Sequence, residues 1–148
     1  MVGSSYIGRT SGGKNTKVHA LVNSQGLPIC LSLSAGNRED FDEAIPLLEL
    51  LPNLEGANLL GDRAYGTKKI RTYLTQQGAE YTIPPTKNLR EPWEYDHERY
   101  KRRNVVERFF CRIKDFRRVA TRYDKRPDSF QAFVFLAASF ASLAILHI

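Results

Sequence analysis

Residues 57–83, with the sequence ANLLGDRAYGTKKIRTYLTQQGAEYTI, decide the predicted fold. They open with a short apolar run, 57–60, which predicts a buried strand. Thr67 then stands where a helix N-cap is favoured, and Gly78 stands where that helix ends. Three residues between them share the spacing of one helical face: Ile70, Tyr73 and Leu74. Residues 80–83 predict a second strand, which two prolines stop, so the stretch predicts a strand–helix–strand unit.

Two stretches of alternating residues upstream predict an antiparallel hairpin. Residues 16–23 alternate, with three apolar side chains on one side of the strand: Val18, Ala20 and Val22. Residues 27–34 alternate again, and Ser24-Gln25-Gly26 between the two stretches is a turn signal. Residues 1–15 are rich in Gly, Ser and Thr and are expected to form a flexible lead-in. The folded domain is therefore predicted over residues 16–148.

Three further helices complete the predicted order. The first covers residues 39–48, with Asn37 as its cap and a kink at Pro46. The second covers 102–118, where the apolar residues fall within about 140° of a helical wheel. The third, 128–146, is apolar on nearly every side, yet its unbroken apolar length is short of the roughly 20 residues that a membrane span needs. We interpret it as a buried core helix.

The order of elements predicts an α/β fold. A hairpin followed by alternating helices and strands is typical of a sheet of mixed direction with flanking helices. Only four strands are predicted, and the chain begins at the hairpin without a strand before it.

Composition limits the possible functions. The chain has 148 residues, enough for one domain, and 42% apolar and 26% charged residues, as in ordinary globular proteins. Its formal charge is +6, but residues 99–126 hold twelve basic and three acidic residues, net +9, which leaves −3 for the remainder. One strongly basic segment on a slightly acidic body predicts an anionic partner.

The spacing of the cysteine and histidine residues is not that of a disulfide scaffold or a zinc site. Cys30 and Cys111 are far apart, and the three histidines are scattered, so neither a disulfide scaffold nor a zinc site is predicted. The N-terminal residues contain no apolar run after a basic stretch, and we therefore expect a cytoplasmic location without a secretory signal.

Asp62 is the first candidate for chemistry. It follows the predicted strand 57–60, at the carboxyl edge where α/β sheets place ligands. A carboxylate at this point can bind a metal ion, but it can equally cap a turn, and its position alone leaves both interpretations open.

The second candidate is a polar stripe on the predicted helix 102–118. On the same wheel, one carboxylate, three cations and one phenol fall within a narrow sector: Glu107, Arg103, Lys114, Arg118 and Tyr100. Such a Glu can be an ion-paired surface residue. It can also hold a divalent metal while the neighbouring cations bind phosphates, which is what phosphoryl transfer on DNA requires.

At this point the sequence resembles a known family. Tyr100-x-x-Arg103-x-x-x-Glu107, with Lys114 seven positions later, is similar to the Tyr-Arg-Glu-Lys signature of bacterial insertion-sequence DDE transposases. Four blocks carry the resemblance, in the order of the family: 7–13 with 16–19, 61–65, 100–114 and 117–124. Together they extend over essentially the whole chain.

The resemblance implies an RNase H-like fold in which two Asp and one Glu bind two Mg²⁺ ions. Such a site cleaves a phosphodiester and joins the DNA strand to a target. By this resemblance Asp62 is the second acid and Glu107 the third, and both are metal ligands. By the same resemblance Arg103 and Lys114 contact DNA phosphate near the cut, and Tyr100 helps to position the strand end. Arg118 is a weaker candidate for DNA contact, which can equally be a solvated surface residue.

The sequence departs from the family at its start. No Asp or Glu precedes Glu39, whereas the family's first catalytic Asp lies on a strand before the hairpin. We therefore expect the first strand, the first Asp and the DNA-end-recognition domain to be missing, and we leave Asp40 and Asp42 without that role. The chain is either the second half of a frameshifted transposase, partnered by the upstream-frame product, or a decayed copy. Alone it is expected to be inactive.

A second class of function remains open. The basic segment 99–126 can act by itself as the phosphate-binding surface of a non-catalytic DNA-binding protein. A serine hydrolase is disfavoured because no Ser has an activating context, and a membrane partner is not expected. The predicted partners are insertion-sequence ends and target DNA at the bacterial nucleoid, and further copies of the chain when the enzyme is complete.

Overall fold

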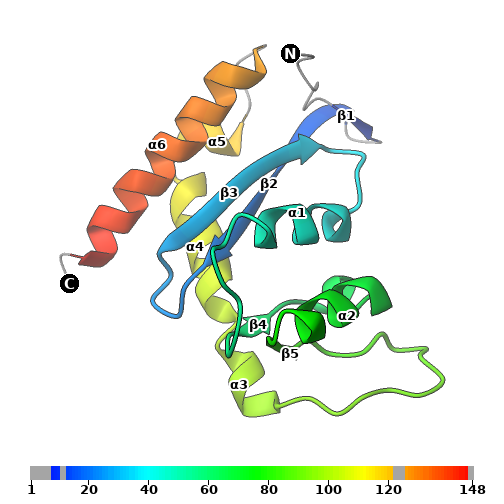
Figure 1. Ribbon diagram of the computed structural model, residues 1–148. Coiled ribbons are helices and arrows are strands. Elements are labelled where there is room, and N and C mark those ends of the chain that lie inside the picture. The colour runs from blue at the N-terminus through cyan, green and yellow to red at the C-terminus, as the bar shows by residue number, and fades with distance from the viewer. Residues whose placement is uncertain (1–7, 11–12, 122–125, 147–148) are drawn as a thin grey trace. The chain divides into compact units, whose positions relative to one another are not determined.

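A computed structural model describes residues 8–10, 13–121 and 126–146 (Figure 1). The chain forms two compact units. The hairpin unit comprises Met1–Arg38 and Val105–Ile148, and the central unit comprises Glu39–Asn104.

The hairpin unit contains a three-stranded antiparallel sheet in the order β1-β2-β3, formed by β1 (Gly8–Thr10), β2 (Gly13–Val22) and β3 (Pro28–Ala35). Val18 pairs with Leu33, and the turn between β2 and β3 contains Gly26 at φ 88°, a conformation that favours glycine. The predicted hairpin is confirmed. β1 and the start of β2 lie inside the stretch expected to be a flexible lead-in, of which residues 1–7 and 11–12 lie outside the described residues.

Two helices cover one face of this sheet (Figure 1). They are α4 (Asn104–Lys114) and α6 (Pro127–Leu146). Phe109 and Ile113 of α4 are buried with three small residues of α6: Ala137, Ala138 and Ala141. Four apolar strand residues pack against them: Val18, Ala20, Val22 and Leu31. Alanines on α6 let its backbone approach the sheet closely, so this face forms the core of the unit.

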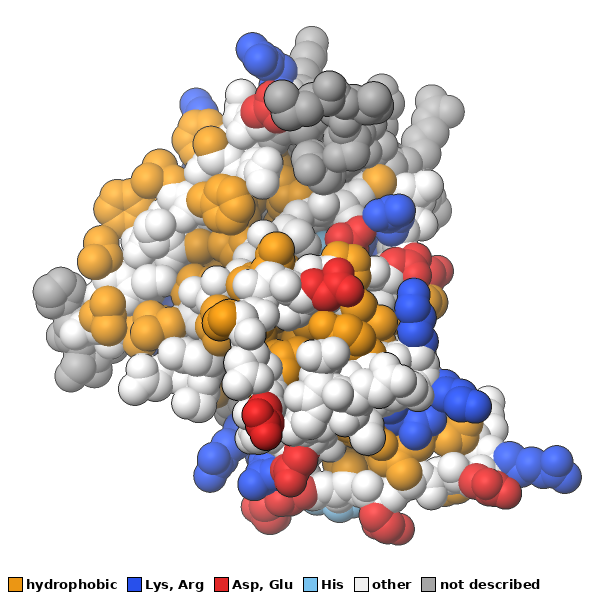
Figure 2. All heavy atoms as spheres, in the orientation of Figure 1, with side chains coloured by type: hydrophobic (Ala, Val, Ile, Leu, Met, Phe, Trp, Pro, Cys, Tyr) orange, Lys and Arg blue, Asp and Glu red, His pale blue; other side chains and the backbone are white. Residues whose placement is uncertain are grey.

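The outer side of α6 is apolar and exposed. Five large side chains on it are 42–65% exposed: Phe135, Leu136, Phe140, Leu143 and Leu146. Figure 2 shows apolar side chains gathered along this helix. The prediction of a buried core helix is therefore wrong for this side. The length argument is also wrong, because Asp128–Leu146 is long and apolar enough to cross a membrane by length and composition.

The central unit contains the strand–helix–strand motif. β4 (Asn58–Leu60) and β5 (Glu80–Thr82) pair in parallel, with Leu59 opposite Tyr81. Between them lie the 3₁₀ turn η2 (Arg63–Tyr65) and the helix α2 (Lys68–Gln76). Thr67 caps α2 by accepting the N–H of Ile70 at 3.3 Å, and Gly78 at φ 70° follows its end. The predictions for this stretch are confirmed.

The helix predicted over residues 39–48 is two elements. A 3₁₀ turn, η1 (Asp40–Glu43), is followed by α1 (Ala44–Leu48). Pro46 therefore lies in the first turn of α1, where its missing N–H has no helical partner to lose and causes no kink. Asn37 does not cap this segment, because Glu39 occupies the N-cap position of η1.

The long helix predicted over residues 102–118 is also interrupted. α3 (His97–Lys101), α4 and α5 (Arg117–Ala120) are separate helices. Phe116, with φ −80° and ψ 108°, is extended and ends the helical path before α5. A single helical wheel therefore does not describe this region, and the predicted polar stripe of five residues is not one helical stripe.

The described residues form a mixed α/β structure with two sheets. The three-stranded sheet is antiparallel and the two-stranded sheet is parallel. The α/β class is confirmed, with five strands in place of the predicted four. Within the described ranges no ladder joins the two sheets into the single mixed sheet that was expected.

Candidate functional site

Asp62 lies between β4 and η2 in the central unit. It is the N-cap residue of η2, and its Oδ1 accepts the N–H of Ala64 at 2.9 Å. Asp62 is half-buried. The turn-capping interpretation is thus confirmed for one carboxylate oxygen, and the same residue still stands at the carboxyl end of a parallel strand, where α/β sheets place ligands.

The pKa of Tyr65, at the other end of η2, is affected by the negative charges near Asp62. Burial raises the pKa of its phenol from 10.0 to about 12, and the negative charges of Asp40 and Asp62 add to this effect. η1 and η2 contact each other, so Asp40 and Asp62 lie in one acidic neighbourhood of the central unit. Sequence reasoning left Asp40 without a role, because the approach of η1 to η2 is a tertiary contact that no local pattern signals.

Tyr100 belongs to α3. This short helix is capped by Asp96, whose Oδ1 accepts the N–H of Arg99 at 2.9 Å. That hydrogen bond is the main cause that holds the pKa of the exposed Asp96 carboxyl below its ordinary value. The cap therefore depends on an ionised Asp96.

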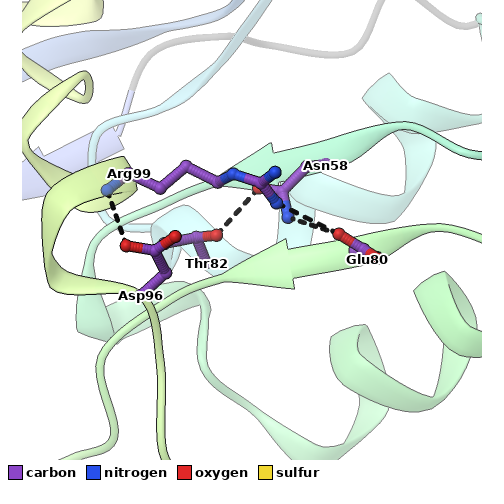
Figure 3. A network of polar contacts seen from close by, with 5 residues as sticks. All are labelled: Asn58, Glu80, Thr82, Asp96 and Arg99. Atoms are coloured by element: carbon purple, nitrogen blue, oxygen red, sulfur yellow. Dashed lines mark hydrogen bonds and ion pairs between the residues drawn. The ribbon is translucent and has the colours of Figure 1, made fainter.

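A polar network ties α3 to the parallel sheet (Figure 3). Arg99 Nη1 donates to Glu80 Oε2 at 3.1 Å, and Asn58 Nδ2 donates to the same oxygen at 3.2 Å. Thr82 Oγ1 donates to Asn58 Oδ1 at 2.8 Å. The side chains of Arg99 and Glu80 are 47% and 72% exposed, so their ion pair adds little stability. The network orients α3 on β4 and β5 and thereby positions Tyr100.

Arg103 accompanies Tyr100. Its guanidinium carbon lies 5.7 Å from the centroid of the Tyr100 ring, within the range of a cation–π contact. The Tyr95 ring meets the Tyr100 ring edge-on, with the ring centroids 5.6 Å apart. Both Tyr100 and Arg103 are half-buried. The structure therefore brings these two predicted DNA-binding residues together in the central unit.

Glu107 and Lys114 belong to α4 in the hairpin unit. Both are exposed, and their separation of seven residues places them on the same helical face two turns apart. Arg118 lies on α5, where its guanidinium carbon is 4.3 Å from the centroid of the Phe133 ring. Of the predicted stripe, only Glu107 and Lys114 share a helix.

The predicted metal ligands have the right chemistry but do not form a complete site. Carboxylate oxygens are the ligands that Mg²⁺ prefers. Asp62 and Glu107 lie in different units, and in the part of the chain that the structure describes no three His, Cys, Asp or Glu side chains are grouped so as to hold a metal. No reaction step follows from these residues alone.

The basic segment presents most of its cations to solvent. Eight of them, among the described residues, are exposed: Arg99, Lys101, Arg102, Arg108, Lys114, Arg117, Arg118 and Arg126. Exposed Lys and Arg at this density can neutralise phosphates of a nucleic acid. Arg122, another cation of this segment, lies outside the described residues.

Comparison with known proteins identifies the class. Residues 4–141 match the family described as "Transposase DDE domain". The chain belongs to this family, the DDE transposases of bacterial insertion sequences, which carry out DNA transposition and use divalent metal ions. The predicted resemblance is thereby confirmed.

Two relatives illustrate the similarity. A protein of Brucella ovis, named as a transposase for insertion sequence element IS6501, is 31% identical over 127 residues, which cover 84% of this chain and 95% of the relative. A protein of Burkholderia cepacia, named as a transposase for IS402, is 27% identical over 128 residues, 80% of this chain but only 58% of that relative. The chain thus spans little more than half of the second relative. No solved structure matches the chain.

Proposed function

We propose that this chain is the C-terminal part of the catalytic domain of an insertion-sequence transposase, with an RNase H-like fold. Asp62 and Glu107 are the acidic residues that it contributes to a Mg²⁺-dependent site for DNA cleavage and strand transfer. The bound metal ions supply the activation of the attacking oxygen and the stabilisation of the leaving oxygen.

One observation carries the proposal. Asp62 lies two residues after the end of β4, a strand in a parallel pair, and precedes the helix α2. In α/β sheets this edge is where ligands bind. A half-buried carboxylate with one oxygen fixed by the Ala64 N–H is held in place without help from a metal ion.

The cations and the phenol serve to hold DNA. Arg103 and Tyr100 form one contact pair, and Lys114 shares a face of α4 with Glu107. A guanidinium beside a phenol can hold a phosphate while the ring restrains the strand. Arg118, an exposed cation of α5, is a further contact for DNA phosphate.

A DNA assay tests the catalytic part of the proposal. We expect the purified 148-residue chain not to nick or join DNA with Mg²⁺, because it has no Asp or Glu before Glu39 to act as the first acid. Addition of the upstream-frame product, carrying that Asp, should produce strand transfer that Glu107→Gln abolishes. Robust Mg²⁺-dependent strand transfer by the chain alone would overturn this view.

A second function is supported by the exposed cations, namely non-catalytic DNA binding through segment 99–126. The two functions differ at Glu107. If the segment only binds phosphates, Glu107→Gln should increase affinity for DNA without any dependence on Mg²⁺. If the residue belongs to a metal site, the same variant should lose the Mg²⁺-dependent part of the binding.

We also propose a cytoplasmic location at the nucleoid, with association of copies in the complete enzyme. A bilayer-spanning role for α6 is disfavoured because Ala137 and its buried neighbours pack on the sheet of the hairpin unit. Cell fractionation tests the location, and light scattering of the complete enzyme on DNA tests the association.

A further inference from the structure

A cleft of about 590 Å³ lies in the central unit beside Asp62. Arg63 and Lys68, from η2 and the start of α2, form one part of its wall. Phe41 and Leu89 contribute apolar surface, and Trp93 and Arg71 also line the cleft. This volume falls in the range of roughly 300–1,000 Å³ that is usual for small-ligand sites. Figure 2 shows Lys and Arg side chains next to apolar ones over this part of the molecule.

Several contacts hold the lining residues Trp93 and Arg71 in place. Trp93 Nε1 donates to the carbonyl of Ile83 at 2.8 Å, and the Trp93 ring meets Tyr81 edge-on. The Arg71 guanidinium stacks 3.9 Å from the Trp93 ring centroid, while its Nε donates to the carbonyl of Gly66 at 3.3 Å. A Cβ at Gly66 would lie 3.2 Å from the Trp93 ring, so glycine permits this close approach. Because these groups are already ordered, a ligand need not order them on binding.

The charges of the cleft are divided. Arg63 and Lys68 are exposed and make no ion pair with any described residue. Glu39 and Asp40 supply carboxylates to the same lining. Phe41 and Leu89 remain 36% and 39% exposed, so they offer apolar surface to a ligand. The cleft thus combines cations, hydrogen-bond acceptors and apolar surface.

We propose that this cleft binds one unpaired nucleotide of a DNA strand next to Asp62, an inference that rests on the proposed function. Arg63 and Lys68 bind the phosphate by charge-assisted hydrogen bonds. Phe41 and Leu89 contact the face of the base. Glu39 accepts from an exocyclic amino group, as acidic side chains do with cytosine. A purely cationic patch would bind phosphates of a duplex equally well, whereas this lining favours a single strand whose base is exposed.

Trp93 is the only tryptophan of the chain and gives a direct readout. Titration of the full chain with a single-stranded oligodeoxycytidylate, whose bases carry the exocyclic amino group, should change the Trp93 fluorescence, and a duplex of the same length should change it much less. Binding of the single strand without any change in Trp93 emission would overturn the proposal.

Adjacent lysines provide a matched pair of variants. Lys68 lines the cleft, while Lys69 is equally exposed on the same helix but does not line it. We expect Lys68→Ala and Arg63→Ala each to weaken single-strand binding about tenfold. Lys69→Ala should change it less than twofold. Equal effects of Lys68→Ala and Lys69→Ala would mean a general charge effect and would overturn the proposal.

Apolar contacts give an independent variant. Leu89→Ser should weaken binding of the single strand by about fivefold and leave duplex binding unchanged, because only an unpaired base offers its face. Equal losses for both DNA forms would contradict this assignment.

The same variants distinguish an error in the cleft proposal from an error in the proposed function. If Arg117→Ala weakens DNA binding while Lys68→Ala does not differ from Lys69→Ala, the cleft proposal fails and the proposed function stands. If the chain binds neither DNA form, both fail. Thermal unfolding of each variant checks that its fold is retained.

Discussion

Asp62 has two proposed roles, a cap for η2 and a ligand for a metal ion, and two substitutions separate them. Because its Oδ1 accepts the Ala64 N–H at 2.9 Å, Asp62→Ala removes both the cap and the charge. Asp62→Asn keeps a side-chain oxygen that can accept the same hydrogen bond and removes only the charge. We expect Asp62→Ala to lower the free energy of unfolding by about 1 kcal/mol, and Asp62→Asn by about 0.3 kcal/mol.

Calorimetry with and without excess Mg²⁺ measures both roles. In a chain of this size 1 kcal/mol corresponds to roughly 2–4 °C in Tm. Mg²⁺ that binds the folded chain should raise the Tm of the parent, and this rise should vanish in both Asp62 variants. Asp115→Asn, which removes an exposed carboxylate in the turn after α4, is the control and should keep the rise.

Two results would refute this reasoning. If Asp62→Ala unfolds at the same temperature as the parent, the hydrogen bond to Ala64 does not stabilise η2. If Asp62→Asn keeps the full Mg²⁺-induced rise in Tm, Asp62 is not a metal ligand.

Three further predictions concern the central unit. The pKa of Tyr65 is raised to about 12, so the stability linked to its proton is present below pH 10 and is lost as the pH rises toward 12. Urea unfolding between these pH values should show a loss of at most about 2 kcal/mol, because the phenol is partly exposed, and Tyr65→Phe should show no such loss. The pKa of Asp96 is lowered, so the stability that its carboxylate gives to the α3 cap is present at neutral pH and is lost as the pH falls through that pKa. The amide chemical shift of Arg99 should change over this pH range in the parent and should not change in Asp96→Asn. Leu74 is fully buried, so Leu74→Ala should cost about 2–5 kcal/mol in chemical denaturation, and a cost below 1 kcal/mol would contradict its core position.

Local signals predicted the strand–helix–strand motif well. Thr67 and Gly78 define the ends of α2 through a side-chain cap and a positive φ, both of which are properties of the residues themselves. The hairpin was predictable for the same reason, since strand alternation and the turn at Gly26 are local. β1 was not, because a three-residue strand in a stretch rich in Gly and Ser has no alternation to detect.

The interruptions on either side of α4 were not predictable from composition. No Gly or Pro separates α3, α4 and α5, and the apolar spacing continues across both breaks. The signature residues Tyr100 and Arg103 therefore fell on one wheel with Glu107, although the structure places them before α4. The resemblance in sequence predicted the family, which is confirmed, but it gave no geometry for these residues.

Two features of the site and surface depend on tertiary contacts. Asp40 lies near Tyr65 only because η1 packs against η2. The outer side of α6 is exposed because Phe130 and Val134, on its inner side, are the residues that face the sheet. Hydropathy alone could not distinguish the two sides, because both are apolar.

We propose that Asp62 and Glu107 are both needed for the Mg²⁺-dependent binding of DNA. A double-variant cycle tests this most directly, with the Mg²⁺-dependent part of the DNA affinity measured for the parent, Asp62→Asn, Glu107→Gln and the combined variant. We expect each single variant to remove this part entirely and the combined variant to lose nothing more. Losses that add independently, or Mg²⁺ dependence that survives in either single variant, would contradict the proposal.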